Sequence, residues 1–419
     1  MKILFVVPYV PSKIYVRPYQ LIRGLVAQGH QVTLATLWTS QADIEALDEL
    51  TAEGVEVYSC AQPKMRSLMN AAAALPGRTP LQAVYSWQPA LAKIIAGLLL
   101  ERKGKDAFDV VHVEHLRGAK YGLYVQELRN QPVYAHIKSL PVIWDSVDSI
   151  THLFQQAARQ SRKFTSRMIT RLELPRTASY EQQLALSFER VLVTSPIDRE
   201  AFSNLYQDRC PDLPIKLLPN GVDLKYFRPG LEDQKESDTL VISGKMSYHA
   251  NVTMVAYLFN KIMPLVWQKN PGVKVWIVGK DPGKNIQQLS KHAGVEVTGT
   301  VPDIRPYLQR AAAAVSPIQY GAGIQNKVLE AMACGTAVVC TPLAVSALQA
   351  VPGTDLLVAD QPESFAESIL NLLKNPPLRQ QLAASGRAYV EKYHDWNQIA
   401  GKLLSIYMEA IQSKAYIDA

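Results

Sequence analysis

The sequence predicts an α/β protein built from two doubly wound domains that follow one another along the chain. Short, continuous apolar runs alternate with helical patterns, which is typical of parallel strands covered by helices on both faces. The runs form two series, the first between Ile3 and Ser195 and the second between Thr239 and Pro342. At 419 residues the chain is also too long for one ordinary hydrophobic core, so two domains are expected.

The start of the chain shows the repeating unit of the first domain. The apolar run Ile3 to Val7 is followed by a helical pattern through Leu21 and Leu25, which ends at Gly29, and the run Val32 to Leu37 comes next. A glycine at this place is typical of a helix C-terminus. Strand, helix and strand with short links predict a right-handed crossover and a parallel sheet.

Further runs with the character of buried strands complete both series. They are VEVYS (55–59), DVVHVE (109–114), PVIWDS (141–146) and RVLVTS (190–195) in the first, and TLVISGK (239–245), VKVWIVGK (273–280), VEVTGT (295–300), AAVSPI (313–318) and AVVCTP (337–342) in the second. The polar stretch from Gly230 to Asp238 has the composition of a surface link between the two series.

Composition limits the classes of protein that fit. The net charge of +7 suits an anionic partner such as a nucleotide or a membrane headgroup, although a mildly basic surface without function has the same composition. The basic residues are not interleaved with aromatic residues, which disfavours a nucleic-acid binder. The four cysteines have neither the spacing of a zinc site nor the number of a disulfide framework, so a reducing compartment is expected.

The distribution of apolar residues predicts a cytoplasmic protein. The N-terminal apolar run is cut by Pro8 and lacks a small-residue cleavage site, so it is interpreted as a strand rather than a signal peptide. No apolar stretch reaches about 18 residues, and we expect no transmembrane span. Any membrane contact, at the inner face of the cell membrane, would be peripheral.

The segment from Ser316 to Pro342 carries the strongest signal for a site. After a predicted strand, Gly321 and Gly323 precede a helix, where backbone N–H groups and the helix dipole attract a diphosphate. Lys327 adds a positive charge, and Glu330 lies where an acidic residue accepts hydrogen bonds from a ribose diol. Alternatively, Lys327 and Glu330 are only a surface pair at i, i+3 spacing.

Two further strand ends carry polar residues. Asp145 and Asp148 follow a predicted strand and are candidates for orienting the acceptor or the sugar, although a turn with an Asx cap explains them equally well. His112, Glu114 and His115 follow another strand, but alternation places His115 on the opposite side from the other two, which argues against a metal triad. We expect His112 to be a core histidine, and His115 or Arg117 to face the ligand.

Five phrases in order resemble glycosyltransferase family 4. They are RGLVAQGHQVTL, LLPNGVDLKYFRP (217–229), GKMSYHANV (244–252), GTVPDIRPYL (299–308) and YGAGIQNKVLEAMACGTAVV. The resemblance implies the GT-B fold, in which two Rossmann-like domains face a cleft, and transfer of a sugar from a nucleotide-diphosphate donor with retention of configuration. It implies an acceptor-side domain at 1–214, a nucleotide-sugar domain at 215–395 and a C-terminal helix at 396–419 that packs back on the first domain.

The donor loop departs from the family pattern. The first of the family's two glutamates is replaced by Ala322. The resemblance therefore implies that the backbone amides of Gly323 and Ile324 make more of the contacts to the donor. Gln325 and Asn326 complete the expected donor contacts. Lys245 matches an arginine of the family and Asn251 stands where a lysine is expected.

Other departures concern the cations and the first domain. Lys327 is our candidate for the missing second cation, and Arg17 for the charged group of the altered N-terminal loop. Val147 stands at a histidine position in the phrase DSVD. In the family a diphosphate oxygen is thought to take the acceptor's proton, so Asp145, Asp148, Lys245 and Lys327 are the catalytic candidates and no strong base is required. No Asp-x-Asp pair occurs, and neither a metal nor another cofactor is expected.

The stretch from Leu153 to Leu174 predicts one basic amphipathic helix. Its cations step by four residues, at Arg159, Lys163, Arg167 and Arg171. Such a helix suits an anionic membrane that carries a lipid-linked acceptor, but an ordinary core-facing helix with a solvated basic face has the same pattern. The expected partners are therefore a nucleotide sugar, a glycan or lipid-linked acceptor, and an anionic membrane surface.

Two other functions fit the same architecture. A non-hydrolysing sugar-nucleotide epimerase shares the two domains but acts on the donor sugar and needs no acceptor. A non-catalytic nucleotide- or glycan-binding module fits the loss of the first glutamate. Release of nucleoside diphosphate in the presence of an acceptor distinguishes a transferase from both.

Overall fold

The computed structural model describes residues 1–160, 164–206, 212–320 and 323–417, and the chain divides into two compact units. Unit 1 comprises Met1–Pro219 and Trp396–Ala419, and unit 2 comprises Asn220–Asp395. The chain therefore leaves unit 1 at Pro219, five residues beyond the expected boundary at 214/215, and the polar stretch 230–238 lies inside unit 2 rather than between the units.

Unit 1 is built on a seven-stranded sheet with the order β3-β2-β1-β4-β5-β6-β7. All its neighbouring strands pair in parallel. The strands are β1 (Lys2–Val7), β2 (Gln31–Trp38), β3 (Glu56–Ala61), β4 (Val110–Glu114), β5 (Val142–Val147), β6 (Arg190–Val193) and β7 (Ile215–Leu217). The doubly wound prediction is confirmed here, and the short edge strand β7 is an addition to it.

Helices cover both faces of this sheet. They are α1 (Val16–Ala27), α2 (Gln41–Ala52), α3 (Lys64–Ala74), α4 (Leu81–Tyr85), α5 (Pro89–Glu101), α6 (His115–Arg129), α7 (Ile150–Gln160), α8 (Phe164–Ser187), α9 (Pro196–Asn204) and α18 (Trp396–Ile417). Alternate residues of β1 belong to two cores: Ile3 and Phe5 lie with α1, α2 and α18, whereas Leu4 and Val6 lie with α5 and α6. The C-terminal helix α18 therefore contributes to the core of unit 1.

The contact between α1 and α18 depends on Gly24. A Cβ at Gly24 would lie 2.7 Å from the Cβ of Ala400 on α18, so only glycine allows the two helices to pack this closely. Gly29, after α1, has a φ of 82°, and the N–H of His30 donates to the carbonyl oxygen of Leu25. This is the expected glycine-dependent end of the helix.

Unit 2 repeats the architecture with a six-stranded parallel sheet of order β10-β9-β8-β11-β12-β13. Its strands are β8 (Glu236–Ser243), β9 (Lys274–Val278), β10 (Val295–Gly299), β11 (Ala311–Ser316), β12 (Ala337–Cys340) and β13 (Leu357–Val358). Its helices are α10 (His249–Tyr257), α11 (Met263–Lys269), α12 (Lys284–Gln287), α13 (Arg305–Arg310), α14 (Asn326–Ala333), α15 (Pro342–Val345), α16 (Pro362–Lys374) and α17 (Pro376–Tyr393).

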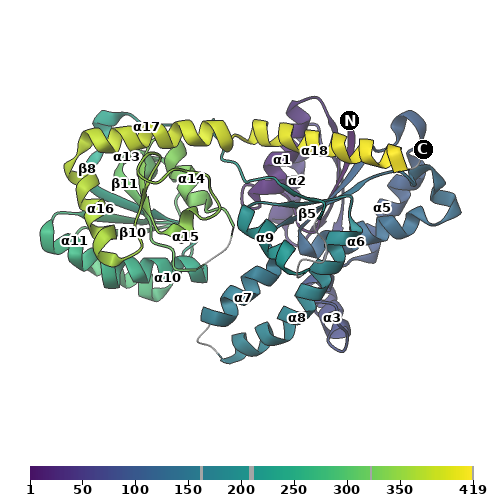
Figure 1. Cartoon of the computed structure of the whole chain (residues 1–419), viewed down its shortest axis with the longest axis horizontal. Helices are drawn as coiled ribbons and strands as arrows, with labels where there is room; N and C mark the ends of the chain where they lie inside the picture. Colours follow the sequence, from purple (N-terminus) through teal and green to yellow (C-terminus); the bar gives the residue numbers. More distant parts are fainter. Residues whose placement is uncertain (161–163, 207–211, 321–322, 418–419) are drawn as a thin grey trace. The chain divides into compact units, whose positions relative to one another are not determined.

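The prediction of one continuous helix over 153–174 is wrong. Helix α7 ends at Gln160, α8 begins at Phe164, and the two helices pack against each other (Figure 1). Residues 161–163, which include Lys163, and the side chains of Arg159 and Arg167 lie outside the described part of the structure. Leu172 of α8 is exposed. Within the described residues, no helix has both the length and the apolar character needed to cross a bilayer.

Candidate functional site

In unit 2, two glycines directly after β8 and β9 bring the backbone at the carboxyl ends of these strands close together. Gly244 and Gly279 have φ angles of 145° and 148°, which L side chains rarely adopt. A Cβ at Gly279 would lie 1.8 Å from the carbonyl oxygen of Gly244, so no side chain fits there. The close approach fixes the backbone at the carboxyl ends of both strands, where ligands bind in such sheets.

Four of the predicted site residues lie beside these two glycines. Asn251, on α10, is buried, and its Nδ2 donates to the carbonyl oxygen of Lys245, 3.0 Å away. The Nζ of Lys327, on α14, donates to Oδ1 of Asn251 at 2.8 Å and to Oε1 of Gln325 at 3.3 Å. The side chain of Lys245 is exposed. Residues separated by more than seventy positions in the sequence therefore form one cluster.

Lys327 and Glu330 have pKa values that approach each other. Burial lowers the pKa of Lys327 to about 8, and the charge of Glu330 opposes this shift. Burial also raises the pKa of Glu330 to about 7, against the effect of Lys327. Both side chains are partly buried. A bare surface pair would not be desolvated in this way, so the simple i, i+3 interpretation does not describe them.

The loop before α14 presents backbone donors. Gly323 has a φ of 72°, and buried Ile324 anchors the loop in the core of unit 2. Gln325 is the N-cap residue of α14 but makes no side-chain capping bond, and Asn326 at the first helical position is exposed. The N–H groups at the start of a helix and the helix dipole favour an anion there. Gly321 and Ala322, named in the sequence analysis, lie outside the described residues.

In unit 1, the structure pairs two residues for which the sequence suggested separate roles. Arg17 donates from Nε and Nη2 to the two carboxylate oxygens of Asp145, at 2.9 and 3.1 Å, and both side chains are buried. Nη1 of Arg17 also lies 3.4 Å from the carbonyl oxygen of Pro219. The pairing has a physical reason, because a buried carboxylate is costly without a countercharge.

His112 and Glu114 lie beside this ion pair. The hydroxyl of Tyr407, on α18, lies 2.8 Å from Nδ1 of His112, and burial followed by the charge of Arg17 lowers the pKa of this imidazole well below its usual value. His112 is thus the neutral core histidine that was expected from the sequence. Burial, with the charge of Asp145, raises the pKa of Glu114 to about 8, and its Oε1 accepts a 2.8 Å bond from the Tyr9 hydroxyl.

Asp148 lies in a different environment from Asp145. Its Oδ1 accepts a 3.1 Å hydrogen bond from the Thr194 hydroxyl, and its side chain is only partly buried. Burial, followed by the charge of Asp198, raises its pKa to about 6. The two aspartates therefore do not act as a matched carboxylate pair.

Backbone strain is concentrated at the carboxyl ends of β4 and β5. His115 has a φ of 64° and Val147 a φ of 70°, and these strands are neighbours in the sheet. The N–H of Asp148 donates to the carbonyl oxygen of Ser146 at 2.9 Å, which closes a three-residue turn around Val147. A β-branched residue is strained in this conformation, and such residues cluster at functional sites.

The imidazole of His115 is neutral and faces aromatic rings. Its Nδ1 accepts a 3.4 Å bond from the N–H of Arg117, and its ring centroid is 6.3 Å from that of Tyr9. Burial and the charge of Arg117 lower its pKa to about 4. The Tyr9 ring lies 4.5 Å from that of half-exposed Tyr15. Strand alternation in the sequence already separated His115 from His112, and the structure adds the positive φ of His115.

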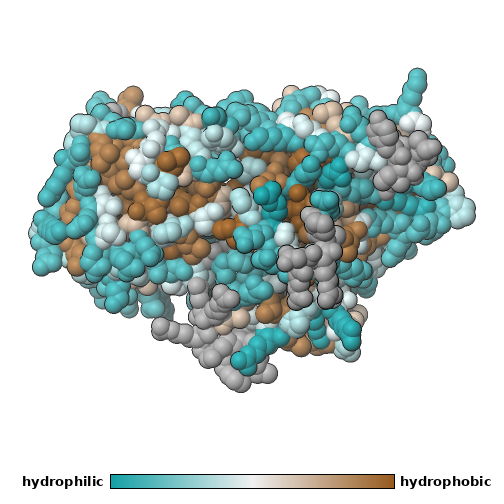
Figure 2. Space-filling view, viewed as in Figure 1, coloured by the Kyte–Doolittle hydropathy of each residue, from teal (hydrophilic) through white to brown (hydrophobic). Residues whose placement is uncertain are grey.

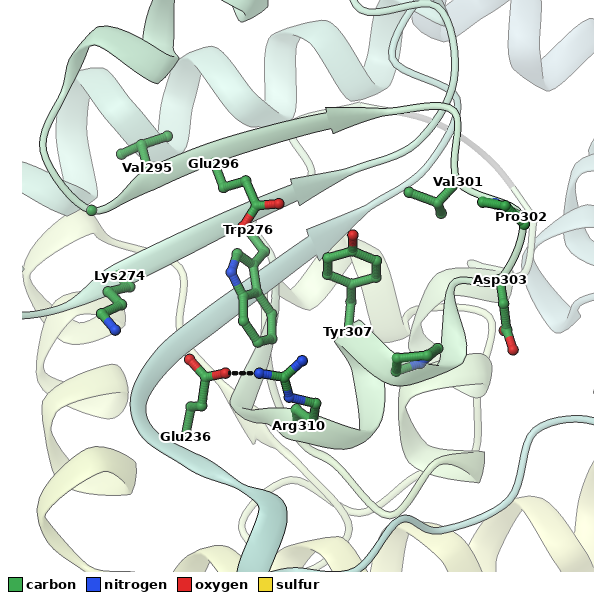
Figure 3. A pocket seen from close by; sticks show the side chains of 12 residues that line it. Glu236, Lys274, Trp276, Val295, Glu296, Val301, Pro302, Asp303, Tyr307 and Arg310 are labelled. Atoms are coloured by element: carbon green, nitrogen blue, oxygen red, sulfur yellow. Dashed lines mark hydrogen bonds and ion pairs between the residues drawn. The ribbon is translucent and has the colours of Figure 1, made fainter.

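A pocket of about 730 Å³ lies elsewhere on unit 2 (Figure 3). Its lining includes the first residues of β8, β9 and β10, at the opposite end of the strands from Gly244 and Gly279, and none of the predicted site residues. Arg310 forms an ion pair with Glu236 and lies 5.4 Å from the Trp276 ring, so its charge is already compensated. The pocket is thus separate from the candidate donor site.

Two family models match the chain, one in each unit. The model described as "Glycosyl transferase 4-like domain" matches residues 14–221, and "Glycosyl transferases group 1" matches residues 237–375. The second match contains the whole cluster of Lys245, Asn251, Lys327 and Glu330. The first contains Arg17, His115, Asp145 and Asp148.

The chain spans a little over half the length of the curated relatives that it matches. D-inositol 3-phosphate glycosyltransferase of Saccharomonospora viridis is 24% identical over 55% of this chain and 58% of its own. Phosphatidyl-myo-inositol mannosyltransferase of Mycobacterium tuberculosis is 27% identical over 48% of this chain and 56% of its own.

Solved structures match over the full chain and show the fold. Sucrose-phosphate synthase from Thermosynechococcus elongatus aligns with a TM-score of 0.65 and 16% identity, over 99% of this chain and 100% of that one. Anabaena HepE in complex with UDP aligns with a TM-score of 0.65 and 15% identity, over 98% and 100%.

Proposed function

The chain belongs to the family-4-type glycosyltransferases of GT-B fold, and we propose that it transfers a sugar from a nucleotide-diphosphate donor to a glycan or lipid-linked acceptor with retention of configuration. The observation that carries the proposal is the cluster at the uncapped start of α14, where Lys327 is held by Asn251 beside the exposed Lys245. This arrangement suits a diphosphate, whose charge grows as the sugar leaves.

In the proposed reaction the acceptor hydroxyl attacks the anomeric carbon from the face that the diphosphate leaves. The bond between the anomeric carbon and the diphosphate oxygen breaks, the glycosidic bond forms, and the hydroxyl proton passes to a diphosphate oxygen. Lys245, Lys327 and the N–H groups of α14 stabilise the leaving group, and Glu330 holds the ribose. Interactions that strengthen with the developing charge lower the barrier, rather than only tightening the binding of the donor.

In unit 1, the proposal assigns His115 to the binding of a substrate hydroxyl. Because Nδ1 accepts the N–H of Arg117, the ring proton is assigned to Nε2. Among the described residues no protein group bonds Nε2, so it is available to a hydroxyl of the sugar or the acceptor. Asp145 is committed to Arg17, which gives this ion pair the role of supporting the strand ends rather than binding the diphosphate directly.

The names of the two relatives guide the choice of acceptor, since both contain an inositol that carries a phosphate. A test incubates the full chain with a panel of nucleotide sugars, including UDP-glucose, and with inositol phosphate, phosphatidylinositol or oligosaccharide acceptors. Nucleoside diphosphate released only with an acceptor, and a product of unchanged anomeric configuration by NMR, support the proposal. Interconversion of the donor sugar without acceptor indicates an epimerase, and donor binding without turnover indicates a binding module.

A further inference from the structure

Helix α3 carries its large apolar side chains on the outside of unit 1. Met65, Leu68 and Met69 are 68%, 60% and 57% exposed, and their i, i+3 and i+4 spacing places them on one side of the helix. Leu75, directly after the helix, is also exposed. These four residues define the α3 stripe.

The face of α3 that is turned inward is small and polar. Ser67 is buried, and its Oγ accepts a 3.0 Å hydrogen bond from Nε2 of Gln62. Nδ2 of Asn70 donates to the carbonyl oxygen of Trp87 at 2.7 Å. A helix that serves only the core places its large apolar residues inward and its polar ones outward. The arrangement in α3 is the reverse, and the inner hydrogen bonds of Ser67 and Asn70 hold the apolar side outward.

The charges around the stripe are positive. No aspartate or glutamate occurs between residues 57 and 100, a range that contains four basic residues. Lys64 at the start of α3 and Arg78 after its end are both exposed. Glu173 of α8 also reaches this region, where its Oε2 accepts a bond from the N–H of Leu81, but it is buried and paired with Arg176. The exposed combination of apolar and cationic side chains therefore complements an anionic surface.

Helix α8 extends the same surface. Nη2 of Arg176 donates to the carbonyl oxygen of Leu75 at 2.7 Å, which joins α8 to the end of α3. One turn before it, Arg171 and Leu172 are exposed. On the viewed face of unit 1, Figure 2 shows hydrophobic side chains (brown) among hydrophilic ones (teal).

We propose that the α3 stripe docks unit 1 on an anionic lipid bilayer. Methionine and leucine side chains of this kind enter the boundary between headgroups and acyl chains, while Lys64, Arg78 and Arg171 bind the headgroups. The membrane contact is thereby assigned to α3 instead of a continuous helix over 153–174. The docking itself does not depend on the proposed function. Only its role, which is to bring the enzyme to a lipid-linked acceptor, rests on that function.

Vesicle sedimentation of the full chain tests the assignment. At low salt the protein is expected to bind vesicles of phosphatidylglycerol mixed with phosphatidylcholine, to bind phosphatidylcholine alone weakly, and to be released by added salt. Met65→Ser/Leu68→Ser/Met69→Ser should weaken binding at least about tenfold, because the buried apolar area is lost. Lys64→Gln/Arg78→Gln should weaken binding to the anionic vesicles alone.

A matched control replaces exposed apolar residues of unit 1 outside the stripe. Leu186→Ser/Met408→Ser removes side chains that are 60% and 50% exposed and should leave vesicle binding unchanged. The inference is overturned when the wild type ignores anionic vesicles at low salt, or when the triple variant binds as well as the wild type. It is also overturned when light scattering shows an oligomer that only the triple variant loses, since the stripe then joins two copies. Binding is measured without donor, so its failure leaves nucleoside diphosphate release on a soluble acceptor as a separate result.

Discussion

Nζ of Lys327 lies 2.8 Å from Oδ1 of Asn251, so the cation on α14 lies directly against the residue that stands where a lysine is expected in the family. The asparagine amide on the other side binds the carbonyl oxygen of Lys245. This contact is what we expect if Lys327 supplies, from a position far along the chain, the charge that Asn251 lacks.

The relocation of this charge predicts a rescue. Lys327→Ala should lower kcat more than it raises KM, by a total of about 1.5–3 kcal/mol, because a charged hydrogen bond to the leaving group is lost. Asn251→Lys in the Lys327→Ala background should recover part of the activity. Steady-state kinetics of the single and double variants measure both effects. If the double variant is no more active than Lys327→Ala alone, positions 251 and 327 do not share the role of binding the diphosphate.

The pKa values of the donor cluster predict a bell-shaped pH dependence of donor binding. Glu330, with a pKa of about 7, must be ionised to accept hydrogen bonds from the ribose, so affinity rises as the pH increases through that value. Lys327, with a pKa of about 8, loses its charge at higher pH, so affinity then falls. Calorimetric titration of the donor from pH 5 to 10 measures the curve.

Single substitutions should remove each limb of that curve separately. Glu330→Gln should abolish the rise near neutral pH and weaken binding by about 1–3 kcal/mol. Lys327→Arg should abolish the fall above pH 8, because arginine stays charged. The exposed Glu363→Gln, also on unit 2, serves as a control that should change neither limb.

The buried ion pair in unit 1 predicts non-additive stability changes. Arg17→Met leaves the carboxylate of Asp145 buried without its countercharge, at a cost of about 3–5 kcal/mol in unfolding free energy. The double variant Arg17→Met/Asp145→Leu should recover most of this loss. Denaturant unfolding of the three variants measures the coupling. Additive losses would mean that Arg17 stabilises the protein through other contacts.

Val147 stands at the histidine position of the family, and we predict that His115 takes over the role of that histidine. Val147→Asn should raise the unfolding free energy by about 1 kcal/mol, because asparagine tolerates a positive φ better than valine.

His115→Ala should reduce kcat, whereas the exposed His136→Ala should not. Val147→His should restore activity to His115→Ala, since Val147 ends β5 and His115 directly follows β4, its neighbour in the sheet. An active His115→Ala variant would remove this histidine from the substrate site while leaving the transferase proposal intact.

The alternation of apolar runs and helical patterns was sufficient to predict the two sheets, because buried parallel strands leave a local signal in the sequence. The short edge strands β7 and β13 were missed, since three and two residues carry too little of that signal. The continuous helix over 153–174 was wrong for a similar reason. Its period of basic residues runs through the chain segment between α7 and α8, and periodicity alone does not show where one helix ends and the next begins.

The sequence by itself determined the α/β class and the glycine-led helix with Lys327 and Glu330, because these depend on residues close together in the chain. The tertiary structure decided which charges meet. Arg17 and Asp145 are 128 positions apart, and their pairing follows from the cost of burying either one alone. It also decided that the stripe of α3 faces outward, since a helical pattern fixes which residues share a face but not whether that face meets the core or the solvent.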